Sequence, residues 1–175
     1  MRPLQETLLI EVLTDIAGRT HEGSGGRSPF FSSALTNMRI SQASIASSYE
    51  SLKPDLRPCI AQITQEHALY IDTFPFPVFR ERILALRACV INSPEGSGKD
   101  VFDETDLTRD LDNDGIVCWG SDSRRGTGTP WDHRSWEFRP WFLKKWWMLT
   151  GGLEGEIGRQ SAWWAEMRGD EFDPV

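Results

Sequence analysis

The chain has 175 residues, 39% of them hydrophobic and 26% charged, with a formal net charge of -7. This length is enough for one domain with a real core, and the modest hydrophobic content predicts that part of the chain is loop. The negative charge excludes binding of DNA, RNA or anionic lipid through the overall electrostatic field, so any such contact requires a local basic patch.

The three cysteines, Cys59, Cys89 and Cys118, are widely spaced and form no CxxC motif. We therefore expect ordinary buried thiols in a reducing compartment, with no disulfide framework and no zinc site. No cofactor is expected. The N-terminus carries acids within its apolar run, unlike a secretory signal, and no apolar stretch is long enough to span a bilayer. The sequence thus predicts a soluble protein of the nucleus or cytoplasm without membrane contact.

The first predicted element is an amphipathic helix over residues 4–17, whose aliphatic residues recur at positions i, i+3, i+4 and i+7. These residues are Leu9, Val12, Leu13 and Ile16. A Gly/Ser-rich stretch follows and predicts a flexible linker. We assign residues 1–28 to this helix and linker, and residues 29–175 to the domain itself. A helix is expected over residues 29–38, and the polar residues 41–58 predict a surface loop.

Residues 60–64 predict a short extended run, and Pro77 begins a helix. The apolar face of that helix is expected to hold Phe79, Ile83, Leu86 and Val90, and its polar positions Arg80, Glu81, Arg82 and Arg87. Further helices are expected over residues 104–111, from Pro140 to the Gly151-Gly152 pair, and over residues 153–168. A short apolar run lies at residues 115–120. The predicted fold is a mainly α, small single domain with minor extended segments and Trp-rich C-terminal helices.

Several motifs stand in a recognisable order. They are "LRPCIAQITQEHALYIDTFPFPVFRERIL", then "GIVCWGSD" with "PWDHRSWEFRPWFLKKWWMLTGG", then "SAWWAEMRGDEFDP". Together they resemble the fungal domain of unknown function found C-terminal to basic leucine zipper (bZIP) regions in transcription factors, over about residues 30–172. The segment "QEHALYID" departs from the paired-His pattern more usual there, and Asp170 stands where Glu is common.

The resemblance implies a nuclear regulator of stress or specialised-metabolism genes, without a known reaction or ligand. Before residue 30 the only cationic side chains are Arg2, Arg19 and Arg27, and no leucine heptad follows them. A bZIP needs a dense basic helix that leads into such a heptad. We therefore expect a stand-alone copy of the domain that does not bind DNA directly and that acts on a protein partner, with a bZIP regulator as the candidate.

Tryptophan is concentrated in the last third of the chain, where five of the eight lie between Pro130 and Gly152. On the helix from Pro140, the spacing predicts a buried stripe of Phe142, Trp146 and Leu149, with Leu143 and Trp147 on the adjacent face and Lys144 and Lys145 toward solvent. A core role is the simplest interpretation. The alternative is a partner or ligand site, for which we select the residues expected to be more exposed: Trp131, Asp132, Trp136, Trp141 and Trp163.

Other patterns are weaker. The basic residues around the tryptophans are typical of a single-strand nucleic-acid platform, but the acidic residues 100–122 are expected to compensate them within the fold. "DLDNDG" at Asp110–Gly115 starts like a calcium loop, yet Ser121 stands where a bidentate carboxylate is required. Neither a nucleophile motif nor a partner for His67 is evident, so we do not expect an enzyme. A small-molecule sensor or an uncharacterised enzyme with an aromatic pocket remains the alternative to an interaction domain.

Overall fold

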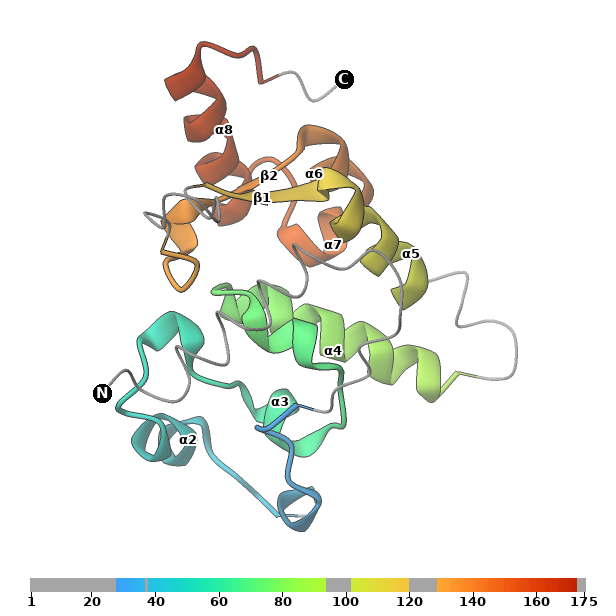
Figure 1. The fold of residues 1–175 in the computed structure, drawn as a ribbon. Helices are drawn as coiled ribbons and strands as arrows, with labels where there is room; N and C mark the ends of the chain where they lie inside the picture. The colour runs from blue at the N-terminus through green and yellow to red at the C-terminus, as the bar shows by residue number, and fades with distance from the viewer. Residues whose placement is uncertain (1–27, 37, 94–101, 120–128, 173–175) are drawn as a thin grey trace. The chain divides into compact units, whose positions relative to one another are not determined.

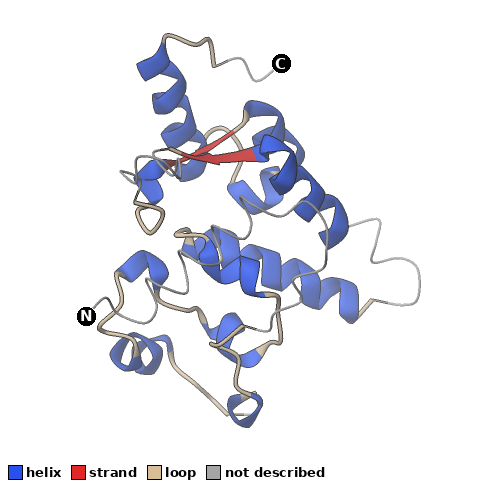
Figure 2. Ribbon diagram, in the orientation of Figure 1, coloured by secondary structure: helices blue, strands red, loops and turns tan. Residues whose placement is uncertain are grey.

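The computed structural model describes residues 28–36, 38–93, 102–119 and 129–172. These residues are mainly helical, as the sequence predicts, with two short strands as the only sheet among them (Figures 1 and 2). The chain groups into two compact units that divide after Leu84. In the described parts of the chain, no helix combines the length and the apolar content that crossing a bilayer requires. The predicted helix at residues 4–17 lies outside the described residues.

The first unit contains short helices joined by turns. They are the 3-10 helix Ser33–Leu35, α2 (Gln42–Ser48), the 3-10 helix Pro54–Leu56, α3 (Ile60–Thr64), the 3-10 helix Leu69–Thr73, and the first part of α4 (Pro77–Ile91). Its core consists of apolar side chains from α2, α3, the 3-10 helix Leu69–Thr73 and α4, together with the turns between them. The buried apolar residues are Ile45, Cys59, Ile63, Ile71, Phe74, Phe76, Phe79, Ile83 and Leu84. Cys59 is thus buried as expected, whereas the expectation is wrong for Cys89, which is exposed, and for Cys118, which is half-buried.

Three predictions for this unit are wrong. The helix expected over residues 29–38 is reduced to one 3-10 turn, Ser33–Leu35, which buries none of its residues. Residues 41–58 are more than a loop, because the Ser41 hydroxyl accepts the backbone N–H of Ser44 and so caps α2. Residues 60–64 form a helix instead of an extended run, because the Gln62 side chain reaches back to accept the Cys59 backbone N–H at 3.0 Å.

Helix α4 begins at Pro77 as predicted, and Phe79 and Ile83 are fully buried on one face. The assignment of Arg80 to the polar face is wrong, because this residue has 0% exposure. The guanidinium Nη2 donates to the Arg57 backbone carbonyl at 2.8 Å, whereas Nε and Nη1 are buried without a hydrogen-bond partner among the described residues. Burial lowers the pKa of the Arg80 guanidinium.

The second unit is arranged around a two-stranded antiparallel ribbon. After the end of α4 come α5 (Glu104–Asp110), a π turn (Leu111–Gly115) and β1 (Ile116–Cys118); then the 3-10 helix His133–Ser135, β2 (Trp136–Phe138), α6 (Pro140–Lys145), α7 (Trp147–Thr150) and α8 (Glu156–Arg168). Ile116 pairs with Phe138 and Cys118 with Trp136. Strand β2, whose three residues are all buried, was not predicted from the sequence.

The helix predicted from Pro140 is interrupted at Trp146, whose φ of -103° and ψ of 33° separate α6 from α7. The expected stripe nevertheless holds, since Phe142 and Leu149 have 0% exposure and Trp146 has 7%. The adjacent stripe predicted for Leu143 and Trp147 is wrong, because Leu143 is buried and Trp147 is 61% exposed. Gly151 ends α7 with a φ of 83°, a left-handed conformation that favours glycine.

The acidic stretch before β1 and the basic stretch on α6 compensate each other in part. Lys145 Nζ lies 2.6 Å from Asp110 Oδ2 and 2.7 Å from Asp106 Oδ2. Asp110 Oδ2 also accepts the indole N–H of Trp146 at 2.8 Å. The first carboxylate of the calcium-like sequence is therefore engaged in holding α6 against α5.

Candidate interaction surface

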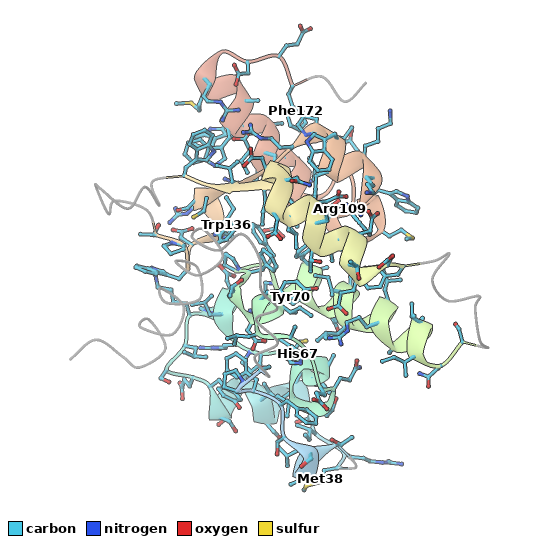
Figure 3. All side chains as sticks on the ribbon, turned by 45° about the vertical axis from the view of Figure 1, so that its right-hand side comes forward. Met38, His67, Tyr70, Arg109, Trp136 and Phe172 are labelled. Atoms are coloured by element: carbon cyan, nitrogen blue, oxygen red, sulfur yellow. The ribbon has the colours of Figure 1, made fainter. Side chains whose placement is uncertain are left out.

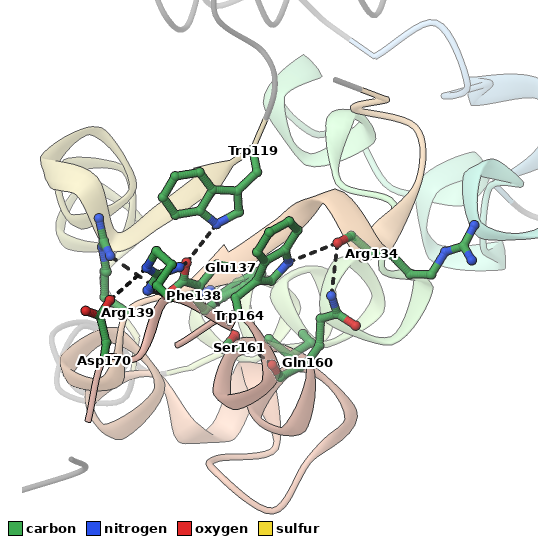
Figure 4. A network of polar contacts seen from close by, with 11 residues as sticks. Trp119, Arg134, Glu137, Phe138, Arg139, Gln160, Ser161, Trp164 and Asp170 are labelled. Atoms are coloured by element: carbon green, nitrogen blue, oxygen red, sulfur yellow. Dashed lines mark hydrogen bonds and ion pairs between the residues drawn. The ribbon is translucent and has the colours of Figure 1, made fainter. Parts of the chain in front are cut away.

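A buried carboxylate in the second unit accepts hydrogen bonds from two other parts of the fold. Glu137, on β2, has 1% exposure. Both of its oxygens accept from the Arg168 guanidinium of α8, Oε2 from Nη1 at 2.6 Å and Oε1 from Nη2 at 2.7 Å, and Oε2 also accepts the Trp119 indole N–H at 2.7 Å (Figure 4). The contact with Glu137 raises the pKa of Arg168. This bidentate pair fastens the last turn of α8 to the ribbon.

Three tryptophans and one arginine form a stack beside this ion pair. The Arg168 guanidinium lies 4.9 Å from the ring centre of Trp119, in cation–π geometry. Trp119 lies 5.6 Å from Trp164, which in turn meets Trp163 edge to face at 5.0 Å. The stack ends at the surface, since Trp163 is 48% exposed. We call Trp119, Trp163, Trp164 and Arg168 the α8 aromatic stack.

The opposite edge of the stack is tied to the 3-10 helix before β2. The backbone carbonyl of Arg134 accepts the Trp164 indole N–H and the Gln160 amide N–H, each at 3.0 Å (Figure 4). Arg134 itself is held by Asp132, whose Oδ2 accepts from Nη2 at 2.7 Å. The hydrogen bond from the Arg134 side chain lowers the pKa of Asp132 to about 2, so this carboxylate is ionised throughout the physiological pH range. Asp132 thus positions backbone that supports α8.

A second exposed surface lies on α6 and α7. Trp141 and Lys144 are exposed three residues apart on α6, and Met148 is exposed on α7, beyond the interruption at Trp146. Trp147, the most exposed tryptophan of the described residues, lies next to Met148. We call these four residues the α6–α7 face.

The structure sorts the five candidate residues into different roles. Trp141 and Trp163 are exposed at 44% and 48%, on different helices. Trp131 is half-buried, and Asp132 is committed to Arg134. Trp136 is a correction: it has 3% exposure, and its indole N–H donates to the Pro130 carbonyl at 2.8 Å, so it belongs to the core (labelled in Figure 3). Trp147 was missed, although it stands three residues after Lys144, which was expected to face solvent.

The first unit contains a buried polar cluster that the sequence analysis also missed. His67 Nε2 lies 2.8 Å from Asp72 Oδ1, and its Nδ1 lies 2.7 Å from the Gln65 carbonyl (His67 is labelled in Figure 3). The same Asp72 oxygen accepts from Gln62 Nε2 at 2.6 Å. All three side chains are buried, so the cluster ties α3 to the 3-10 helix Leu69–Thr73. The partner of His67 is therefore Asp72, five residues later. Nothing in the sequence distinguishes Asp72 from the other acidic residues nearby.

Comparison with known proteins gives one family. A family model described as a domain of unknown function (DUF3425) matches residues 35–158. No curated protein and no solved structure matches the chain. The matched segment covers most of both units, including the buried polar cluster, β1 and β2, and the α6–α7 face. The chain therefore belongs to the DUF3425 family of domains of unknown function.

Proposed function

We propose that this chain is a protein-interaction domain of transcription regulators, which acts on a protein partner and has no DNA contact of its own. One observation carries the proposal: Trp141, Trp147 and Trp163 expose 44%, 61% and 48% of their surface to solvent. Tryptophan is the residue type most enriched at the energetic centres of protein interfaces, and it is seldom left this exposed without a use.

A stacking site for a base or a flat small molecule is less well supported at the α8 aromatic stack. The face of the Trp119 ring is covered by Arg168, and the edge of that indole is held by Glu137. A stacked ligand would have to displace an intramolecular cation and expose a buried carboxylate. The exposed rings of Trp147 and Trp163 carry no such cost when a protein surface covers them.

The transcriptional role rests on the resemblance of the sequence motifs to the fungal domain that follows bZIP regions. A fungal bZIP regulator is accordingly the proposed partner, the nucleus or cytoplasm the proposed location, and genes of stress response or specialised metabolism the proposed targets. These 175 residues contain no dense basic helix followed by a leucine heptad. We propose that these residues reach DNA through contact with a DNA-bound regulator.

The partner is tested by a pull-down with the full chain and bZIP regulators expressed from the same genome. We expect one of them to be retained, and Trp147→Ala or Trp163→Ala to weaken its binding about tenfold or more, because truncation of a central tryptophan typically costs that much. The matched control is Met38→Ala, which removes an exposed apolar side chain of the first unit and should bind as wild type. Failure of every regulator to bind, together with a stoichiometric small molecule in a native mass spectrum, would replace this proposal with the sensor alternative.

DNA binding by the chain alone is tested separately. We expect no sequence-specific duplex binding at physiological salt, because the net charge is -7 and Lys145, Arg139 and Arg168 already face carboxylates. A gel shift with the purified chain should therefore disappear when competitor DNA is added. A shifted band that survives competitor would contradict the prediction.

A further inference from the structure

Helix α8 buries one side and exposes large apolar side chains on the other. The buried side faces the ribbon and holds Ile157, Gly158, Ser161 and Ala165. At 100° per residue, Trp163 stands on the opposite side of the helix, where it is 48% exposed. Met167, four residues later, extends the same outward side and is 64% exposed. The outward side of α8 thus presents two large apolar side chains to solvent.

Two opposite charges flank Trp163 on this outward side. Arg159 precedes it by four residues and Glu166 follows it by three, spacings that keep side chains on one side of a helix. Neither makes an ion pair with a residue that the structure describes, and the Arg159 guanidinium donates to the Glu154 backbone carbonyl. The two charges are seven residues, or about 10 Å, apart along the axis, too far to pair with each other. We call Arg159, Trp163, Glu166 and Met167 the α8 outer face.

The order of these charges makes the α8 outer face complementary to a copy of itself. In an antiparallel pair of α8 helices with a two-fold axis at Trp163, Arg159 of each copy lies within about 1.5 Å of the level of Glu166 of the other. The pair therefore forms two Arg–Glu contacts, one on each side of the central tryptophans. A parallel pair would place like charges opposite each other, so the charges favour the antiparallel arrangement.

We propose that two copies of this chain associate through the α8 outer face, packed antiparallel about a two-fold axis at Trp163. Every residue of the face belongs to one continuous helix of the second unit. That helix has 13 residues, or about 20 Å, so the contact buries less than the roughly 1,200 Å² of a standard interface. The dimer is therefore weak and reversible, with an expected dissociation constant of about 10–100 µM.

Like charges approach each other at the two ends of the pair. There, Glu156 of one copy comes level with Asp170 of the other. Asp170 is already paired with Arg168, whose Nε lies 2.7 Å from Asp170 Oδ2, so its charge is largely compensated within its own chain. The repulsion at the ends is therefore smaller than the attraction at the two Arg–Glu contacts.

This dimer goes beyond the proposed function and does not rest on it. Trp141 and Trp147 lie outside the α8 outer face, so a protein partner that binds them leaves this face to the second copy. A partner that covers Trp163 would instead exclude the second copy. Dimerisation is measured on the purified chain without any partner, so its failure and the failure of partner binding are separate results.

Sedimentation equilibrium of the purified full chain, over a range of about 10 µM to 1 mM, measures the association. The weight-average mass of the wild type should rise with concentration from that of a monomer toward that of a dimer. Trp163→Ala should weaken the dimer about tenfold, because it removes the indole at the centre of the contact. The matched control is Trp147→Ala, which removes an exposed indole from α7 and should dimerise as wild type does.

Charge reversal tests the antiparallel arrangement. Arg159→Glu and Glu166→Arg should each weaken self-association about threefold or more, because each places like charges opposite each other at both contacts. An equimolar mixture of the two variants should regain the association, since each contact then joins an Arg and a Glu again. A chain that carries both reversals should also dimerise as wild type does.

The two reversals should leave the fold intact. Arg159→Glu places an acid in the first turn of α8 and Glu166→Arg a base in the last turn, and both suit the helix dipole. The circular dichroism spectrum and the urea midpoint should therefore stay those of the wild type. A wild type that stays monomeric up to about 1 mM overturns the proposal. Association that Trp163→Ala and both reversals leave unchanged, or that the mixture does not restore, overturns it as well.

Discussion

Trp146→Ala is expected to lower the free energy of unfolding by about 3–5 kcal/mol, the usual cost of emptying a buried tryptophan site. Trp146 contacts Phe142 at a ring-centre distance of 6.3 Å and Phe102 at 6.1 Å, so its removal leaves a cavity between α6 and the segment before α5. The substitution also removes the indole N–H that donates to Asp110. Because a domain is stable by only about 5–15 kcal/mol, this loss is a large share of the total and should lower the urea midpoint strongly.

The neighbouring residue provides the control. Trp147→Ala removes the same side chain from an exposed position and should change the free energy of unfolding by at most about 0.5 kcal/mol. Urea melts of both variants, followed by circular dichroism, measure the difference. Equal midpoints for Trp146→Ala and wild type would show that the tryptophans of this helix are not part of the core.

The second large effect is expected at the ion pair between β2 and α8. Arg168→Leu should cost about 2–3 kcal/mol, because the buried Glu137 carboxylate would keep only the Trp119 N–H and the Arg139 guanidinium, 3.8 Å away, to stabilise its charge. The figure is below that for a fully buried pair, since 28% of the Arg168 side chain is exposed. Arg168→Lys should recover only part of the loss, because an ammonium cannot make both parallel hydrogen bonds.

A double variant separates the charge from the packing. In Glu137→Gln with Arg168→Leu, the buried group is neutral, so the double variant should be more stable than Arg168→Leu alone. Urea melts at pH 7 provide all the values of the cycle. A double variant whose loss equals the sum of the two single losses would mean that the pair contributes no coupling, contrary to the geometry.

Helical spacing predicted the parts of this structure in which burial follows one face. Phe142, Trp146 and Leu149 are buried as expected, and α4, α5 and α8 lie close to their predicted positions. Glycines gave the helix ends, since Gly151 and Gly169 both adopt the left-handed conformation that stops a helix. These signals are local, so they are present in the sequence itself.

The wrong predictions concern residues whose conformation or burial depends on contacts that the local sequence pattern does not show. The chemistry of Arg80 predicts a surface residue, yet its side chain is buried and donates to the Arg57 carbonyl, 23 residues earlier. Residues 60–64 alternate too little to distinguish a strand from a short helix, and the Gln62 side chain decides in favour of the helix. Trp136 lies outside the predicted helices, so no periodicity marked it as buried, and only tertiary packing separates it from the exposed Trp141 and Trp163.

The course of α8 limits how this fold can be divided. The family match ends at Gly158, the third residue of the helix, but the contacts that secure β2 come later. Ser161 Oγ accepts the Phe138 backbone N–H at 2.9 Å, and Arg168 neutralises Glu137. A fragment that ends with the matched segment would lack both of these contacts to β2. The smallest transferable module, whether for expression or for fusion to another protein, must therefore extend at least through Arg168.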